Sequence, residues 1–313
     1  MSATTATAAA NPVLRGMLLV SLAMLIVPLM DAFAKLLSAT IPTGQVAGAR
    51  FLFQTLFMLP LMLWMLGWRS LRPQRFGWHA LRGALLAIAT LLFFTALKYM
   101  PIANAIAIFF VEPLILTLMS GLFLGEKVGW RRWVAVLVGF AGAMLVIRPS
   151  FGEIGWVALM PVGTAICFAS YLALTRALAK GEDPISMQCY TGFFGTLVMA
   201  AAIAAGSVGG VNFLTLVWPT PAELGLMAAL GLISTISHLM VVYAYRMAEA
   251  AVLAPFQYLE IISATALGLM LFGDFPDALT WLGIAIIVGS GLFVFWREQR
   301  QPRDTPSEPV SAP

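Results

Sequence analysis

Charge is what this 313-residue sequence lacks most. Only 10% of its residues are charged, 61% are hydrophobic, and the mean hydropathy is +0.92. Soluble domains carry about 25% charged and about 45–50% apolar residues. A chain this apolar cannot bury its hydrophobic surface around one aqueous core, so its solvent is lipid. The composition excludes a soluble protein and indicates an integral membrane protein.

Cysteine and histidine are also scarce, with two of each. Cys167 and Cys189 fall inside apolar segments, where cysteine packs as a small hydrophobe, so neither a disulfide framework nor a metal site is expected. His79 and His238 are too few for a histidine-based catalytic centre. The sequence contains no GxxxxGK[ST] loop and no HExxH motif, which argues against ATP hydrolysis and zinc-dependent hydrolysis. We expect no cofactor and no metal.

Ten apolar segments are each close to the roughly 20 residues that a helix needs to cross a bilayer. They are too long and too continuous for barrel strands, so the predicted fold is an all-α membrane bundle of ten transmembrane helices. The first segment is expected to be retained, because it is long for a signal peptide and carries charged residues. The segments span residues 14–37, 44–66, 79–98, 102–124, 130–147, 154–178, 185–206, 222–245, 251–272 and 279–297.

Basic residues are distributed unequally between the two sides of these segments. With the N-terminus inside, we place only Lys35, Arg50, Lys98 and Arg148, of 18 lysines and arginines, outside. The positive-inside rule therefore predicts that both termini are cytoplasmic. The basic clusters face anionic lipid headgroups, so the net charge of +4 does not call for a nucleic-acid partner.

The two halves of the chain align when one is shifted by 148 residues. The register is continuous over about 40 residues and coincides with the helical segments, which indicates a duplication. The matches include Ala96 with Ala244, Ala103 with Ala251, Glu112 with Glu260, Thr117 with Thr265, Gly125 with Gly273 and Trp133 with Trp281.

This duplication predicts the domain organisation. Residues 14–148 and 149–297 form two five-helix repeats, and residues 1–13 and 298–313 form disordered tails. Because five is odd, the second repeat enters the membrane inverted relative to the first. Inverted repeats suit alternating access to a site near the midplane.

Glu112 and Glu260 interrupt apolar runs at equivalent places in the two repeats. A charge at the bilayer centre costs about 2.5–3.5 kcal/mol on insertion scales, so such residues face a wet cavity or a partner. We expect both near the middle of a helix and beside one central cavity, where they bind substrate or protons. The alternative is two protonated glutamates that donate interhelical hydrogen bonds. Pro113 and Pro255 mark the same two segments as kinked or cavity-lining.

Asp31 and Arg50 are further candidates in the first repeat. Asp31 lies four residues before Lys35, a spacing that permits an ion pair on one helical face, although Lys35 could equally snorkel to the outer surface. Arg50 begins the second segment near the outer interface, where it is either an anchor or a cation at the mouth of a cavity.

Four other polar residues lie within the apolar segments of the bundle. His238 is interpreted as the only intramembrane histidine, with either a proton-exchange role or a hydrogen-bonded packing role. Tyr258, Gln257 and Asn104 add donors and acceptors that would suit an organic, partly aromatic solute. Together with the acids and Arg50, they complete the predicted substrate- or proton-binding set.

Each half closes with a Gly-acid turn and a glycine-rich final helix, LFLGEKVGWRRWVAVLVGFAGAMLVI and LMLFGDFPDALTWLGIAIIVGSGLFVF. With these features, residues 14–297 resemble the drug/metabolite transporter superfamily of EamA type, from which Asp274 departs by replacing the usual Glu. The resemblance implies a secondary carrier of small organic solutes in the bacterial inner membrane. It also implies a central cavity built mainly from helices 1–4 and 6–9.

A narrower resemblance concerns PLMDAFAKLLS, ARFLFQ and TALKYMPIANAIAIFFVEPL, which are similar to a bacterial group that includes riboflavin and S-adenosylmethionine carriers. Riboflavin uptake is the leading interpretation. Export of amino acids, nucleosides or drugs, S-adenosylmethionine transport and, more remotely, a membrane-embedded enzyme remain open. The expected partners are a small-molecule substrate and the bilayer, without an ATPase subunit, in a monomer or homodimer.

Overall fold

The computed structural model describes residues 12–123, 130–178, 182–248 and 250–300, and within these ranges it contains helices and no strand. The predicted all-α fold is therefore confirmed. The elements are α1 (Pro12–Leu37), α2 (Thr43–Leu66), η1 (Trp68–Leu71), α3 (Phe76–Leu97), α4 (Ile102–Phe109), α5 (Glu112–Phe123), α6 (Trp130–Ile154), η2 (Gly155–Leu159), α7 (Met160–Leu178), α8 (Pro184–Gly209), η3 (Asn212–Leu214), α9 (Pro221–Met247), α10 (Ala250–Gln257), α11 (Leu259–Phe272) and α12 (Ala278–Arg300).

The helices follow the ten predicted segments closely. Seven described helices are long and apolar enough to cross a membrane, and shorter apolar helices over residues 102–116, 133–147 and 278–293 fall in the other three segments. Helix α1 begins at Pro12 and α12 continues to Arg300, slightly beyond the predicted tail boundaries. The rest of the predicted tails, and the first-half turn at Gly125 and Glu126, lie outside the described residues.

Helix ends are set by local chemistry. Asp183 caps α8 by accepting a hydrogen bond from the Ile185 amide at 2.8 Å. Thr220 and Glu223 form a reciprocal capping box at the start of α9. Helix α11 ends at Gly273, whose φ of 72° is a left-handed conformation that favours glycine. These caps satisfy backbone groups that would otherwise be costly to leave unpaired near lipid.

The fourth and ninth segments differ from the prediction, because each is split into two short helices. Helix α4 ends at Phe109 and α5 begins at Glu112, whereas α10 ends at Gln257 and α11 begins at Leu259. Pro113 has no amide hydrogen, so the Phe109 carbonyl loses its usual helical donor. A shift of 148 maps 102–109 onto 250–257, so the two breaks are equivalent in the repeats.

Helix packing also follows the repeat. In the repeat, α1 is equivalent to α7, α2 to α8, α3 to α9 and α5 to α11. The α1–α9 contact therefore matches the α3–α7 contact, and α2–α9 matches α3–α8. In the same way, α1–α11 matches α5–α7. Helices α2 and α8, and likewise α6 and α12, pack on their own repeat counterparts. Such matched contacts are the pattern that a pseudo-two-fold axis between the halves produces.

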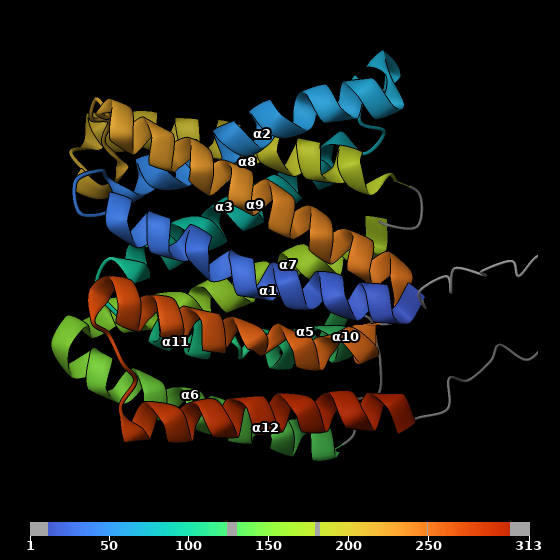
Figure 1. Cartoon of the computed structure of the whole chain (residues 1–313), viewed down its shortest axis with the longest axis vertical. Helices are drawn as coiled ribbons and strands as arrows, with labels where there is room; N and C mark the ends of the chain where they lie inside the picture. The colour runs from blue at the N-terminus through green and yellow to red at the C-terminus, as the bar shows by residue number, and fades with distance from the viewer. Residues whose placement is uncertain (1–11, 124–129, 179–181, 249, 301–313) are drawn as a thin grey trace, which may run out of the picture.

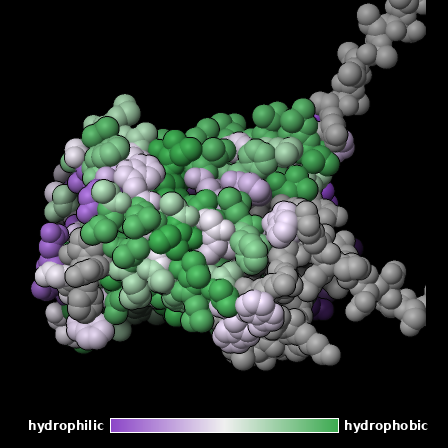
Figure 2. Space-filling view, turned by 90° about the horizontal axis from the view of Figure 1, so that it is seen from below, coloured by the Kyte–Doolittle hydropathy of each residue, from purple (hydrophilic) through white to green (hydrophobic). Residues whose placement is uncertain are grey.

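Helix α1 begins and α12 ends at the same end of the bundle (Figure 1), which we call the termini end. Five crossings separate the start of α1 from the start of α7, so these two helices run in opposite directions. The side of the membrane on which the termini end lies stays a prediction from the basic residues. Figure 2 shows apolar side chains covering the middle of the face seen from the α6 and α12 side, as a lipid-facing surface requires.

Close approach of α6 and α12 depends on glycine. A Cβ added at Gly283 would lie 2.7 Å from the Gly142 carbonyl oxygen and 2.5 Å from a methyl carbon of Val146. Glycines in α6 and α12 therefore allow these two helices to pack closely inside one subunit.

We predict that Gly283→Ala destabilises the protein by about 1–3 kcal/mol, because the added methyl group forces α6 and α12 apart. The matched control is Gly225→Ala in α9, where an added Cβ meets nothing within 4 Å. Thermal unfolding in detergent measures both variants. Equal unfolding temperatures for the two variants would contradict the close contact.

Candidate functional site

Four of the predicted residues form one electrostatically connected group inside the bundle. Asp31 from α1 and Arg50 from α2 interact with each other, Glu260 from α11 interacts with Asp31, and His238 from α9 interacts with Arg50. Asp31, Arg50 and Glu260 are 1%, 2% and 9% exposed. We call these four residues the central group. It draws on both halves of the chain.

The central group keeps hydrogen-bonding capacity that the protein does not use. The Arg50 guanidinium donates to the Thr90 hydroxyl at 3.0 Å and lies 4.6 Å from the centre of the Phe51 ring. The Arg50 Nε and the Asp31 Oδ1 are buried without a hydrogen-bond partner, and among the described residues no direct ion pair joins Asp31 to Arg50. An unused donor and an unused acceptor in one buried place can recognise a polar solute.

A second group lies where the two helix breaks meet. The rings of Phe110 and Tyr258, which are repeat equivalents, have centroids 5.1 Å apart, so both lie beside the pseudo-two-fold axis. Glu112 interacts electrostatically with Tyr258. Glu112 is the first residue of α5 and Glu260 the second of α11, so both lie at helix starts rather than mid-helix as predicted. The positive end of a helix dipole favours a carboxylate there.

Of the two alternatives left open for Lys35, an ion pair with Asp31 or the outer surface, the structure does not show the ion pair among the described residues. The Lys35 ammonium lies 2.8 Å from the Asp274 carboxylate, donates to the Met100 carbonyl at 3.0 Å and sits 4.8 Å from the centre of the Phe272 ring. Lys35 thus connects α1 to the turn before α12, and Arg50 takes its place as the cation near Asp31.

Other predictions are refined by the structure. Arg50 is not an interfacial anchor, because it is buried within the bundle. The Nδ1 of His238 lies 2.8 Å from the Ser234 carbonyl oxygen, one turn earlier in α9. This contact fits the packing role and also leaves His238 a member of the central group. Asn104 is buried in α4, with no hydrogen-bond partner at its Oδ1. Gln257 ends α10, immediately before the break at Tyr258.

Sequence reasoning missed two buried groups in α3. His238 is not the only histidine within a span, since His79 lies in α3 and is fully buried. Arg82, which was assigned to the cytoplasmic side, is 1% exposed because α3 begins at Phe76 and carries it two turns into the bundle. Their spacing of three residues, which places them on one helical face, was the available signal.

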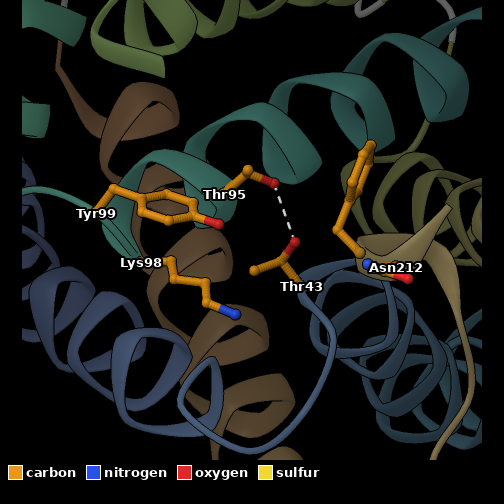
Figure 3. A pocket seen from close by; sticks show the side chains of 6 residues that line it. Thr43, Thr95, Lys98, Tyr99 and Asn212 are labelled. Carbon is orange, nitrogen blue, oxygen red and sulfur yellow. Dashed lines mark hydrogen bonds between the residues drawn. The ribbon is translucent and has the colours of Figure 1, made fainter. Parts of the chain in front are cut away.

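A small cavity of about 180 Å³ lies at the opposite end from the termini (Figure 3). The Thr43 and Thr95 hydroxyls lie 3.1 Å apart at its wall, about two turns along α2 from Arg50 and between one and two turns along α3 from Thr90. It is smaller than the roughly 300 Å³ typical of ligand pockets and does not contain the buried acids. The lining residues are Thr43, Thr95, Lys98, Tyr99, Asn212 and Phe213.

Comparison with known proteins finds similarity along both halves of the chain. The model of the EamA-like transporter family matches residues 14–148 and 155–296. The chain is 33% identical to a riboflavin transporter of Vibrio cholerae over 84% of this chain and 86% of the relative. It is 29% identical to an S-adenosylmethionine uptake transporter of Rickettsia bellii over 86% and 88% of the two chains. A solved structure titled "Crystal structure of protein" shares the fold, with a TM-score of 0.60 and 21% identity over 91% and 98%.

We predict that Lys35 and Asp274 are energetically coupled by about 1 kcal/mol, as expected for a partly buried ion pair. Lys35→Met and Asp274→Asn should each lower the unfolding temperature, and the double variant should cost less than the sum of the two. A double-mutant cycle from thermal unfolding in detergent measures the coupling. Strictly additive losses would show that the 2.8 Å contact contributes nothing.

Proposed function

The chain belongs to the EamA-like transporter family, and from this membership we propose that it carries riboflavin, or a close chemical relative, across the membrane by alternating access. It is a multi-pass transporter of a small molecule, and its place is the inner membrane. Riboflavin is supported by the relative from Vibrio cholerae, which is similar along most of both chains.

The observation that carries the proposal is the central group. Asp31 and Arg50 come from the first half of the chain, whereas His238 and Glu260 come from the second. A solute bound among them contacts both halves, as alternating access at a repeat interface requires. The flavin ring edge presents an imide N–H between two carbonyl oxygens. Asp31 can accept a hydrogen bond from this N–H, and Arg50 can donate one to a neighbouring carbonyl oxygen.

Aromatic rings near this group supply surfaces for a planar solute. Phe93, Phe109, Phe168 and Tyr171 form a continuous set of ring contacts at centroid distances of 5.9, 5.4 and 5.6 Å. Tyr171 also interacts electrostatically with Arg50. A flavin held by its polar edge at Arg50 would therefore have aromatic faces within reach.

The remaining candidates take supporting roles in the proposal. Glu112 and Glu260, at the starts of α5 and α11, bind the solute or a proton where the helix dipoles favour negative charge. Asn104, Gln257 and Tyr258 line the path beside the breaks. Such a cycle involves no catalytic step and no ATPase subunit, and one subunit carries the whole set of residues.

S-adenosylmethionine is the second candidate, and the composition of the site favours it. Asp31, Glu260 and Glu112 are three buried carboxyl groups, and a solute with an ammonium and a sulfonium cation would pair with them. The relative from Rickettsia bellii carries that name. The two candidates differ in charge, so a direct uptake comparison separates them.

We predict that proteoliposomes containing the protein take up radiolabelled riboflavin, and that Asp31→Asn or Glu260→Gln lowers kcat/KM at least about tenfold, a loss of about 1.4 kcal/mol of stabilisation. Both substitutions keep the side-chain shape and remove the charge. Uptake of S-adenosylmethionine, measured in the same vesicles, tests the second candidate.

The matched control is Glu153→Gln, which removes an exposed carboxylate and should leave uptake unchanged. Wild-type uptake by both site variants would remove the acids from the mechanism while leaving the transport function. Absence of uptake of either solute by the wild-type protein would instead refute the assigned substrates.

A further inference from the structure

A set of buried polar contacts at the termini end, which includes the Arg82 guanidinium, ties the two halves of the chain together. The Nε2 of His79, which is fully buried in α3, lies 2.6 Å from the Oε2 of Glu182, just before α8. The guanidinium of Arg82, one turn further along α3, donates to the Thr175 hydroxyl at 3.0 Å and to the Tyr171 hydroxyl at 3.3 Å. Each of these contacts joins the first half of the chain to the second.

Two contacts of α8 reinforce this set. The Tyr190 ring packs on His79 with centroids 4.7 Å apart, and its hydroxyl donates to the Ser70 carbonyl in η1. Arg82 also donates to the Met187 carbonyl at 3.4 Å. No acceptor of Arg82 in the described structure carries a charge. His79 interacts electrostatically with both Arg82 and Glu182, so the Glu182 carboxylate lies in the neighbourhood of this buried guanidinium.

The opposite end has an equivalent tie with different chemistry. A shift of 148 relates α3 to α9. By the order of the helices in the two halves, the connection before α8 corresponds to the connection before α2, although not in that register. In that equivalent place, the Thr40 hydroxyl donates to Glu223 at 2.5 Å in an exposed hydrogen bond. Gln45 adds a two-bond contact with the Val217 backbone at 2.8 and 2.9 Å. The repeat thus places a tie at each end, and the Thr40–Glu223 tie is exposed where the His79 side of the termini-end tie is fully buried. The Lys35–Asp274 ion pair, which is partly buried, also joins the two halves at the opposite end.

We infer that His79, Arg82 and Glu182 form a latch that holds the termini end closed during transport. The inference rests on the alternating-access cycle proposed above. With the halves together, Glu182 contacts His79 beside the buried Arg82 guanidinium; with the halves apart, water solvates all three residues. Removing Glu182 therefore raises the free energy of the closed state more than that of the open state, and the population shifts towards opening at this end.

The latch also reaches the central group. The Tyr171 hydroxyl accepts from Arg82, and the same residue interacts electrostatically with Arg50. A solute that rearranges Arg50 therefore acts close to Tyr171, which is a direct contact of the latch. Tyr171 is a positioning residue in this arrangement, because it connects the two sites through its hydroxyl and its ring.

Cys189 provides a native reporter of opening. It is 3% exposed in α8, next to Tyr190, and packs against Met58 and Met62 of α2 in the other half. Parting the halves at the termini end exposes its thiol. In a Cys167→Ser background it is the only cysteine, since the chain has two.

The experiment measures the rate at which N-ethylmaleimide labels Cys189 in the full-length Cys167→Ser protein in detergent. We expect Glu182→Gln to raise this rate about tenfold, which corresponds to a shift of about 1.4 kcal/mol in the opening equilibrium. His79→Gln, a second variant that weakens the same contact, should also raise it. Size-exclusion chromatography confirms that each variant is folded.

Glu223→Gln is the matched control, because it makes the same carboxyl-to-amide change in the tie at the opposite end. A labelling rate in Glu182→Gln or His79→Gln that exceeds both the parent and Glu223→Gln supports the latch. Parental labelling in both latch variants, or equally fast labelling in Glu223→Gln, overturns it. No solute is needed, so failure of riboflavin uptake and failure of the latch are separate results.

Discussion

The cost of burying charge in a bundle surrounded by lipid is the constraint on which the structure depends. Arg50, Arg82 and Asp31 are each almost completely buried, and a lone charge in that position is expensive. Each of them interacts with groups contributed by other helices, and those of Arg82 all belong to the other half of the chain. Buried charge therefore does two things at once: it holds the halves in register and it marks where a polar solute can be bound.

The repeat provides a symmetric frame for chemistry that is not symmetric. The helix breaks, the equivalent glutamates and the Phe110–Tyr258 contact obey the shift of 148. Arg50, Arg82 and His79 have no charged equivalents in the second half. A carrier whose two ends were identical would open equally readily at either end. The different polar residues therefore give the two ends different free energies of opening, although the helices are arranged in the same way.

Prediction succeeded where the information is local. Segment lengths and hydropathy located the spans, because a bilayer sets the length of apolar helix needed to cross it. The duplication stays a prediction, with which the equivalent breaks after Phe109 and Gln257 agree. For Lys35 the sequence left two alternatives, an ion pair with Asp31 or the outer surface, and neither identified Asp274, which the side chain reaches across the bundle. Pro113 and Pro255 marked the interrupted segments, but the exact breaks depend on how the two halves pack.

By itself, the sequence determined the membrane environment, the helical segments and the list of acids, and it predicted the repeat, because hydropathy and periodicity are properties of contiguous residues. The tertiary structure alone decided that Asp31 lies near Arg50, that Arg82 is buried, and that Glu182 meets His79. These residues are separated by helices whose relative rotation no local pattern encodes. Their partners are selected by packing, which requires each buried charge to find compensation among whatever groups the fold brings within reach.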